Sequence, residues 1–244
     1  MNMKLAQQRL LIVGGTSGFG ETVAEQALAA GATVHVIGHS QAHVDAALER
    51  LQAKAPVMIG TALDAQDPDQ LGVFFSCQPK FDHVLSFLGG AMGGGFLDND
   101  VATIRQAIED KFFANLQLAK AAVGHLNAHG SLIFTSGAGG HPDDASGAII
   151  GNQAINTMVA GLAVEMAPDF RVNAVAPTWT PTGLWRKLTI QQVDQQAHDF
   201  AQGVPLKRVA TKAEVASAYL YLMQNDFVTG QVLHVDGGVD LGVR

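Results

Sequence analysis

The sequence predicts a single α/β domain with a doubly wound parallel sheet, and three observations lead to this fold class. Short stretches of β-branched and apolar residues alternate with longer stretches rich in Ala, Leu, Gln and Glu along the 244 residues. Such alternation is typical of a parallel sheet with helices on both faces. Apolar residues make up 48% of the chain, which is enough for a large core, and no change of composition divides residues 1–244.

Each element is expected where its pattern is clearest. The seven strands are expected in the short apolar stretches, namely Arg9–Gly14, Thr33–Gly38, Val57–Leu63, Phe81–Leu88, Gly130–Ser136, Phe170–Ala176 and Gln231–Val235. The helices are expected between them, at Gly18–Ala30, Ala42–Ala53, Gln66–Cys77, Asn99–Ala128, Gly147–Met166 and Thr211–Met223. Right-handed crossovers in a doubly wound fold favour the strand order 3-2-1-4-5-6-7. Residues 178–205 interrupt the alternation and are expected to form a lid with a short helix; an irregular surface loop is the alternative.

Charge and composition exclude several classes of function. The formal net charge is −7 and no basic run is present, so we expect no nucleic-acid partner. No stretch approaches the ~20 apolar residues of a membrane span, and Met1–Gln8 has no apolar core of a secretory signal. The single cysteine, Cys77, fits a reducing compartment, and we expect a cytoplasmic protein. No Cys/His cluster has zinc-ligand spacing, so no metal is expected.

A glycine-rich turn follows the first expected strand and precedes the first helix. Its glycines, Gly14, Gly18 and Gly20, have the spacing Gly-x3-Gly-x-Gly. Glycines let a backbone approach a pyrophosphate closely, and a helix N-terminus presents free N–H groups to it. An ordinary tight turn is the alternative, but the strand–turn–helix context favours a dinucleotide site. The residues expected at that site are Gly14, Thr16, Ser17, Gly18, Phe19 and Gly20.

This turn resembles that of the short-chain dehydrogenase/reductase family, and the similarity extends over almost the whole chain. Arg171–Pro177 is close to a family signature, and Pro205–Val209 and Val235–Gly238 match its C-terminal pattern. The resemblance implies a Rossmann-type fold and hydride transfer between a nicotinamide dinucleotide and a small carbonyl or alcohol. It also implies a homo-oligomer, a dimer or tetramer, paired through the helices Asn99–Ala128 and Gly147–Met166. The further cofactor-binding residues that it implies are Asp64, Gly89, Pro177 and Thr182.

The end of the second strand bears on the choice of cofactor. An NAD-selective site usually has an acid there for the ribose 2′-hydroxyl, whereas this chain has Gly38-His39-Ser40. That segment resembles an NADP-preferring pattern of the family in which His replaces Arg. We therefore expect NADP, bound at His39 and Ser40, with NAD as the alternative.

The catalytic positions depart from the family pattern, which uses a tyrosine, a lysine four residues later, a serine and an asparagine. The tyrosine position falls on Ala148 and the lysine position on Asn152. Ser136 stands at the serine position, and Lys111 at the asparagine position. Lysine and asparagine are thus exchanged. The exchange predicts a retained, modified proton relay; drift after loss of catalysis is the alternative.

Sequence periodicity places both polar residues on apolar helical stripes. Lys111 continues the stripe of Ile104 and Ile108, and Asn152 continues that of Ile155 and Val159; both stripes are expected to face the sheet. Burial of an unpaired polar group on such a stripe is unfavourable. These positions are therefore candidates for a functional role.

Three functions are compatible with these residues. The first is an oxidoreductase in which Ser136, Lys111 and Asn152 act and in which a water chain, or His141 in the loop after Ser136, supplies the proton. A polar surface loop is the alternative reading of His141. The second function is a dinucleotide-binding module without chemistry, and the third is a non-redox enzyme on the same fold. Substrate identity is not encoded in any of these patterns.

Overall fold

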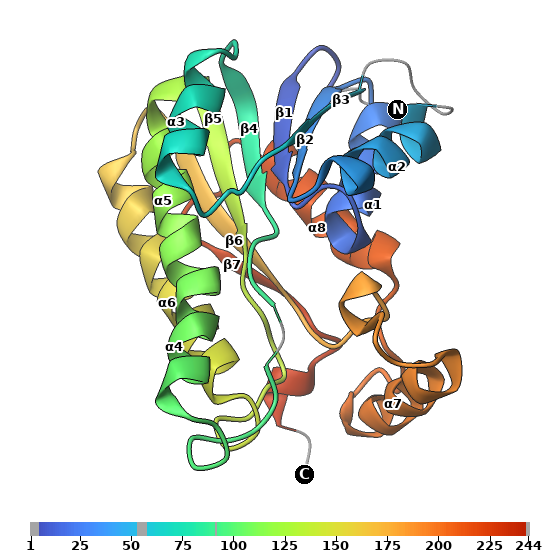
Figure 1. The fold of residues 1–244 in the computed structure, drawn as a ribbon. Coiled ribbons are helices and arrows are strands. Elements are labelled where there is room, and N and C mark those ends of the chain that lie inside the picture. Colours follow the sequence, from blue (N-terminus) through green and yellow to red (C-terminus); the bar gives the residue numbers. More distant parts are fainter. Residues whose placement is uncertain (1–4, 53–57, 91, 243–244) are drawn as a thin grey trace.

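A computed structural model describes residues 5–52, 58–90 and 92–242. Its centre is a seven-stranded parallel sheet in the order β3-β2-β1-β4-β5-β6-β7, so the expected topology is confirmed (Figure 1). The strands are β1 Arg9–Val13, β2 Thr33–Gly38, β3 Met58–Ala62, β4 Phe81–Ser86, β5 Leu126–Thr135, β6 Arg171–Pro177 and β7 Val232–Val235. The expected strand start at Val57 and helix end at Ala53 lie outside the described residues.

Helices cover both faces of the sheet. On one face, α1 (Gly18–Ala29), α2 (Gln41–Gln52) and α8 (Lys212–Gln224) enclose a core that includes buried Tyr219. On the other face lie α3 (Pro68–Ser76), α5 (Ala114–Ala122) and α6 (Ser146–Glu165). Two apolar cores therefore sandwich the sheet, as expected of a doubly wound fold.

Local sequence signals fix where several helices begin. Asp67 caps α3 by accepting hydrogen bonds from the N–H groups of Asp69 and Gln70, and Pro68 occupies the first turn. Thr211 and Glu214 form a capping box at the start of α8. These caps satisfy backbone donors that would otherwise lack partners at the helix ends.

The helix expected over Asn99–Ala128 is wrong as a single element. It is divided into α4 (Val101–Ile108), a π-helical turn (Glu109–Phe113), α5 and a 3₁₀ turn (Val123–His125), after which β5 begins at Leu126. Asn115 accounts for part of this irregularity, because its side-chain amide donates to the backbone carbonyl of Lys111 and competes with regular helical bonding. π-Helical turns occur frequently at functional sites.

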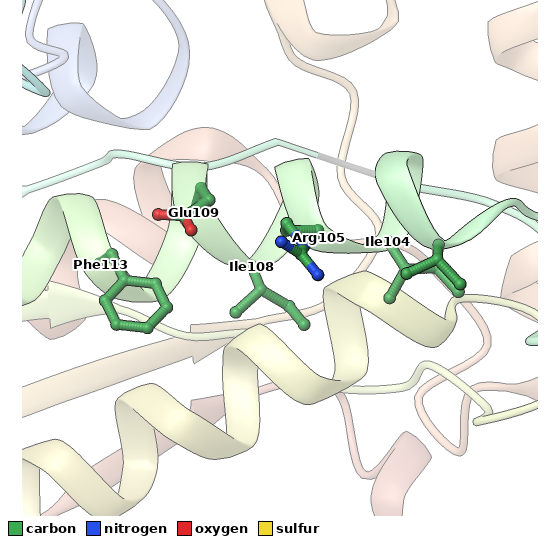
Figure 2. Close-up of a pocket in the computed structure, with 6 residues that line it drawn as sticks. Ile104, Arg105, Ile108, Glu109 and Phe113 are labelled. Atoms are coloured by element: carbon green, nitrogen blue, oxygen red, sulfur yellow. The ribbon is translucent and has the colours of Figure 1, made fainter.

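The same turn changes the direction of the stripe expected to face the sheet. Ile104 and Ile108 instead line a groove of about 410 Å³ on the outer side of α4, together with Val101 and Phe113 (Figure 2). Of the expected stripe, which continues from Lys111 to Asn115, only these two residues are buried. The π-helical turn contains more residues than an α-turn, so residues on either side of it no longer share one face.

By length and composition alone, α6 could cross a membrane. Its side chains Ile155, Met158 and Val159, however, are buried in the core against the sheet. A buried core helix of a globular domain passes the same test of length and composition.

The segment 178–205 contains more regular structure than expected. It forms a 3₁₀ turn, Gly183–Trp185, and the 14-residue helix α7, Ile190–Gly203. Thr189 and Gln192 provide a capping box that starts α7. In Figure 1, α7 lies beyond the carboxyl ends of the strands, apart from the helices that cover the sheet.

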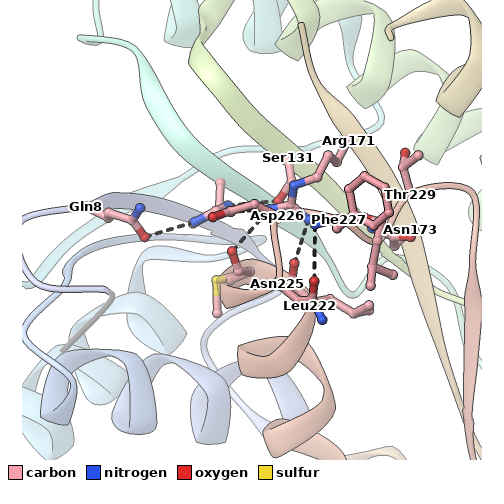
Figure 3. Close-up of polar contacts among 12 residues, drawn as sticks. Gln8, Ser131, Arg171, Asn173, Leu222, Asn225, Asp226, Phe227 and Thr229 are labelled. Carbon is pink, nitrogen blue, oxygen red and sulfur yellow. Dashed lines mark hydrogen bonds and ion pairs between the residues drawn. The ribbon is translucent and has the colours of Figure 1, made fainter. Parts of the chain in front are cut away.

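Arg171 joins the end of α8 to the start of β6. Its Nη1 donates to the carbonyl of Leu222 at 2.8 Å and its Nη2 to that of Met223 at 3.1 Å (Figure 3). The Asp226 carboxylate lies 3.8 Å from the guanidinium. A buried cation at the C-terminal end of a helix is favoured by the unpaired carbonyls and the dipole there. The interaction fixes β6, whose other end forms part of the cavity described next.

Candidate active site

A cavity of about 1100 Å³ lies at the carboxyl ends of the strands. Its wall comes from the turns after β1, β2, β3, β4, β5 and β6 and from the segment between β6 and α7. It includes the point where the strand order reverses between β1 and β4, which is where doubly wound sheets bind ligands. The groove on α4 in Figure 2 lies away from the sheet edge and contains no nucleophile, so the larger cavity is the candidate active site.

The glycine turn forms one end of the cavity. All six residues expected there are in its wall, namely Gly14, Thr16, Ser17, Gly18, Phe19 and Gly20. A Cβ on Gly20 would lie 2.4 Å from the carbonyl oxygen of Gly14, so only glycine allows the strand and α1 to approach so closely. Ser17, the N-cap of α1, makes no side-chain capping bond, which leaves the first turn of the helix to an anionic ligand.

The adjoining wall contains His39 and Asp64, as expected, and also His43, which the sequence analysis did not identify. Ser40 does not line the cavity. Its Oγ instead accepts a bond from the backbone N–H of His43 at the start of α2. A serine that caps a helix cannot be distinguished from a phosphate ligand by position alone.

Ser136 lies buried just beyond β5 and lines the opposite end of the cavity. Its Oγ donates to Oδ1 of Asn156 at 2.6 Å and lies 3.2 Å from the carbonyl oxygen of Asn152. Because a hydroxyl has one proton, these contacts leave Ser136 Oγ as an acceptor toward the cavity. Asn156 was missed by the sequence analysis, although its position four residues after Asn152 places both on one side of α6.

Lys111 occupies the π-helical turn, with its side chain in the wall of the cavity. The aliphatic stem passes between two glycines from other elements. A Cβ on Gly89 would lie 2.4 Å from Lys111 Cδ, and one on Gly151 would lie 2.9 Å from Cγ. Nζ has no hydrogen bond or ion pair within the part of the chain that the structure describes. Burial lowers the pKa of the ammonium group from 10.5 to about 8.

Asn152 also depends on a neighbouring glycine. It lines the cavity beside Ala148, and a Cβ on Gly137 would lie 2.5 Å from Asn152 Nδ2. Lys111 and Asn152 stand at the positions where the family pattern has asparagine and lysine. Each side chain lies against glycine, Lys111 against Gly89 and Gly151 and Asn152 against Gly137.

His141 does not line the cavity. Its side chain is exposed, and its backbone carbonyl accepts bonds from the N–H groups of Asp144 and Ala145, which are in the wall instead. The loop forms a turn at this point, and the histidine lies on its exposed side. His141 is therefore not positioned as the proton donor.

Neither tyrosine of the chain lines the cavity. Tyr219 is buried beneath β5, and its hydroxyl lies 2.7 Å from Thr135 Oγ1. Burial raises the pKa of the phenol, so Tyr219 stays protonated. Tyr221 is half-exposed on the same helix. The cavity therefore has no phenolic hydroxyl among its described lining residues.

The segment after β6 completes the wall. Pro177 and Thr182 line the cavity, as expected, and so do Trp179 and Trp185. The two indole rings are stacked, with centroids 5.4 Å apart and an interplanar angle of 23°. Trp185 Nε1 donates to the carbonyl of Thr180 at 3.0 Å, which fixes the orientation of this ring. An aromatic wall therefore closes this end of the cavity.

Outside the cavity, His234 in β7 and Asp236 and Asp240 in the turn after it lie within reach of one metal ion. Their oxygens already accept bonds from backbone N–H groups of Gly139, Gly238 and Asp240. The arrangement is explained by these internal contacts, and the cluster gives no support for a metal site.

Comparisons with known proteins agree with this fold and cavity. A family model described as enoyl-(acyl carrier protein) reductase matches residues 13–240. A short-chain dehydrogenase/reductase of Gibberella fujikuroi is 33% identical, over 96% of this chain and 95% of that protein. A tropinone reductase homologue of Arabidopsis thaliana is 31% identical, over 96% and 92% of the two chains.

Solved structures give the same result. A small-chain dehydrogenase in complex with NADPH has 28% identity and a TM-score of 0.82, over 97% of this chain and 100% of that chain. A glucose/ribitol dehydrogenase from Brucella melitensis has 22% identity and a TM-score of 0.87, over 98% and 99%, and shows the shared fold. The sheet order and glycine-walled cavity define an α/β protein of the Rossmann type. The chain belongs to the short-chain dehydrogenase/reductase family, a family of oxidoreductases.

Proposed function

We propose that the protein transfers hydride between a nicotinamide dinucleotide and a small carbonyl or alcohol, with Lys111 in place of the usual tyrosine–lysine pair. The observation that carries this proposal is the fit of the Lys111 stem between Gly89 and Gly151. That fit directs a cation with no partner among the described residues into the cavity. The family relationship supports the reaction class.

The cavity fits a dinucleotide along its length. The glycine turn and the uncapped start of α1 suit a pyrophosphate, and Pro177 and Thr182 lie in the wall of the other half. When bound, the dinucleotide supplies or accepts a hydride at its nicotinamide ring. NADP is favoured over NAD because His39, and no acid, follows β2. The NADPH complex of the similar dehydrogenase supports the same choice.

The chain's own residues bind and polarise the substrate oxygen. The Lys111 ammonium donates to this oxygen and stabilises the negative charge that develops there as hydride adds to the carbon. Asn156 orients Ser136, whose Oγ accepts a bond from a water or a substrate hydroxyl. Asn152 holds a water or a ribose hydroxyl beside Ala148. Each of these groups is positioned before substrate arrives, as electrostatic catalysis requires.

Water is the proposed source of the proton. Reduction adds one hydride to carbon and one proton to oxygen, and neither His141 nor a tyrosine is in the wall to supply that proton. Lys111, with a pKa of about 8, can donate a proton at neutral pH and regain it from water. Loss of a positioned phenol predicts slower turnover, on the order of 10²–10⁴-fold, unless the lysine compensates.

A comparison of lysine variants tests the proposal. Lys111→Met is expected to reduce hydride transfer on the order of 10²-fold or more, because it removes the charge that stabilises the oxyanion. Lys120→Met, at an exposed position of α5, is the matched control and should leave the rate unchanged. The assay follows NADPH or NADH oxidation with a panel of ketones and aldehydes. Equal rates for wild type and Lys111→Met would contradict the role of Lys111.

Two other functions remain as alternatives with distinct outcomes. If the protein binds dinucleotide but the wild type turns over none of the panel, the binding-module reading replaces the enzyme. If a substrate is converted while the dinucleotide is neither oxidised nor reduced, the protein is a non-redox enzyme on this fold. The glycine turn supports dinucleotide binding in all cases, whereas the Lys111 fit favours chemistry.

We also propose a homo-oligomer in the cytoplasm. The groove on α4 exposes apolar side chains, including Val101 and Phe113, beside α6, whose Val164 is also exposed. Such a surface is unfavourable on a monomer and suits pairing with a second copy. The free thiol of exposed Cys77 fits a reducing compartment.

A further inference from the structure

The substrate half of the cavity combines one buried cation with an aromatic wall; exposed Arg186 also lines the cavity, where its Nη1 donates to the carbonyl of Gly183. The buried cation is Lys111, and the aromatic wall is the stacked pair Trp179 and Trp185, which Phe200 extends at a ring distance of 6.2 Å from Trp179. Ile149 is a further apolar lining residue. Together these groups suit a ligand with a flat apolar body and a polar end.

The charge on Lys111 has no counterpart in the described protein. The acidic residues in the cavity wall are Asp64, whose carboxylate accepts the N–H of Gln66 after β3, and the exposed Asp144. Neither carboxylate lies within the 4.0 Å of an ion pair with Nζ. A buried cation is normally paired, because burial of an isolated charge is strongly unfavourable. The missing partner is therefore expected to arrive with a ligand.

A neutral carbonyl alone, polarised by Lys111 as in the proposed function, would leave the charge of Lys111 without a counter-ion until hydride adds. Ser136 Oγ directs its proton to Asn156, so Ser136 cannot donate to a carbonyl oxygen in this arrangement. Lys111 is left as the buried charged donor, since exposed Arg186 donates to the carbonyl of Gly183, and a cation binds an anionic oxygen more strongly than a neutral one. The aromatic wall, in turn, favours a planar body that can stack on it.

We infer that the protein acts on planar, conjugated or aromatic carbonyl or alcohol compounds that carry an anionic oxygen beside the reacting oxygen. Lys111, with three N–H donors, binds both oxygens while the ring system packs against Trp179 and Trp185. The inference rests on the proposed function, which places the substrate in this half of the cavity. It specifies the chemical class of substrate, whereas the proposed function specifies only the reaction.

The two tryptophans provide the test, because they are the only tryptophans in the chain and both line the cavity. The probes are 2-naphthoate and 2-naphthamide, which share one shape and differ in charge. Affinity is measured by calorimetry at pH 7, where Lys111 is mostly protonated, and quenching of indole fluorescence reports contact with the aromatic wall. Titrations are run with and without saturating NADP.

For the wild type we expect naphthoate to bind at least about tenfold more tightly than naphthamide and to quench the indole fluorescence. In Lys111→Met the preference should vanish, whereas Lys120→Met should retain it. Equal affinities in the wild type, or a preference that survives in Lys111→Met, would overturn the inference. Displacement of naphthoate by NADP would also overturn it, because the anion would then occupy the dinucleotide half.

The outcome is separable from that of the proposed function. A protein that binds NADP but does not discriminate the two probes retains the proposed reaction and loses this substrate class. A protein that binds no dinucleotide loses the proposed function, whatever the naphthoate result. If Lys111→Met fails to fold, equal affinities of the wild type for naphthoate and naphthamide would still overturn the inference.

Discussion

Replacement of Lys111 by methionine should stabilise the folded protein while it removes activity. Burial lowers the pKa of Lys111 from 10.5 to about 8, a difference of 2.5 (10.5 − 8). At about 1.4 kcal/mol per pKa unit, the charged lysine destabilises the folded state by about 3 kcal/mol at neutral pH. Methionine is long and unbranched enough to lie between Gly89 and Gly151 without the charge. Lys111→Met should therefore regain most of this free energy.

The pH dependence of this difference distinguishes charge from packing. Between pH 8 and 10.5 the unfolded lysine binds a proton that the folded lysine does not, so wild-type stability rises with pH across this range. The advantage of Lys111→Met should be about 3 kcal/mol at pH 7 and about 1 kcal/mol at pH 10. Both are measured by urea denaturation at fixed protein concentration, with Lys120→Met as the control. A Lys111→Met variant less stable than wild type at pH 7 would refute the reasoning.

Three further predictions follow from other sites. Burial lowers the pKa of His83 from 6.5 to about 4, so the free energy of unfolding should fall as pH drops below about 6.5. The variant His83→Gln should lose about 2 kcal/mol less than the wild type between pH 7 and pH 5. Identical urea denaturation profiles of the two proteins at both pH values would contradict this prediction. Gly151→Ala should displace the Lys111 stem and lower turnover at least about tenfold, with unchanged dinucleotide affinity. Gly161→Ala, at an open position of the same helix, should leave turnover unchanged. Equal turnover of the two variants would contradict the role of Gly151 in positioning Lys111. Phe113→Glu should shift light scattering from the oligomer toward the 25.6 kDa protomer; a wild type that is already monomeric would disprove the interface.

Most of the framework is predictable from the sequence because local patterns determine it. The strand order follows from the alternation of strands and helices and from the handedness of crossovers. The glycine turn is recognisable because strand, glycines and helix are contiguous. Helix starts such as that at Thr211 depend on residues three positions apart. These features require no knowledge of which distant side chains meet.

The parts that failed depend on distant contacts. The π-helical turn at Lys111 is not encoded by apolar spacing, since the same spacing fits a continuous α-helix. His141 and Ser40 are near the cavity in sequence, but His141 is exposed in a turn outside the cavity wall, and the Ser40 hydroxyl accepts the N–H of His43. Asn156 reaches Ser136 only because α6 packs beside β5.

The glycines beside Lys111 illustrate the same limit. In the sequence, Gly89 belongs to a glycine-rich stretch after β4 and is expected to bind the cofactor. Gly151 lies within an expected helix and has no assigned role. Their role appears only when the stem of Lys111 is found between them. The same contacts support the proposal that Lys111 is a positioned group, and the two readings of Lys111 that the sequence left open stay predictions for the Lys111→Met comparison.

The central claim is that hydride transfer in this protein depends on Lys111, and isotope transfer tests it most directly. NADPH deuterated at the transferable position is incubated with a panel of ketones and aldehydes that includes planar, ionisable members, and the products are analysed by mass spectrometry. The account predicts deuterium in product with wild type and with Lys120→Met, and on the order of 10²-fold less with Lys111→Met. Equal incorporation with and without the Lys111 amine would contradict it.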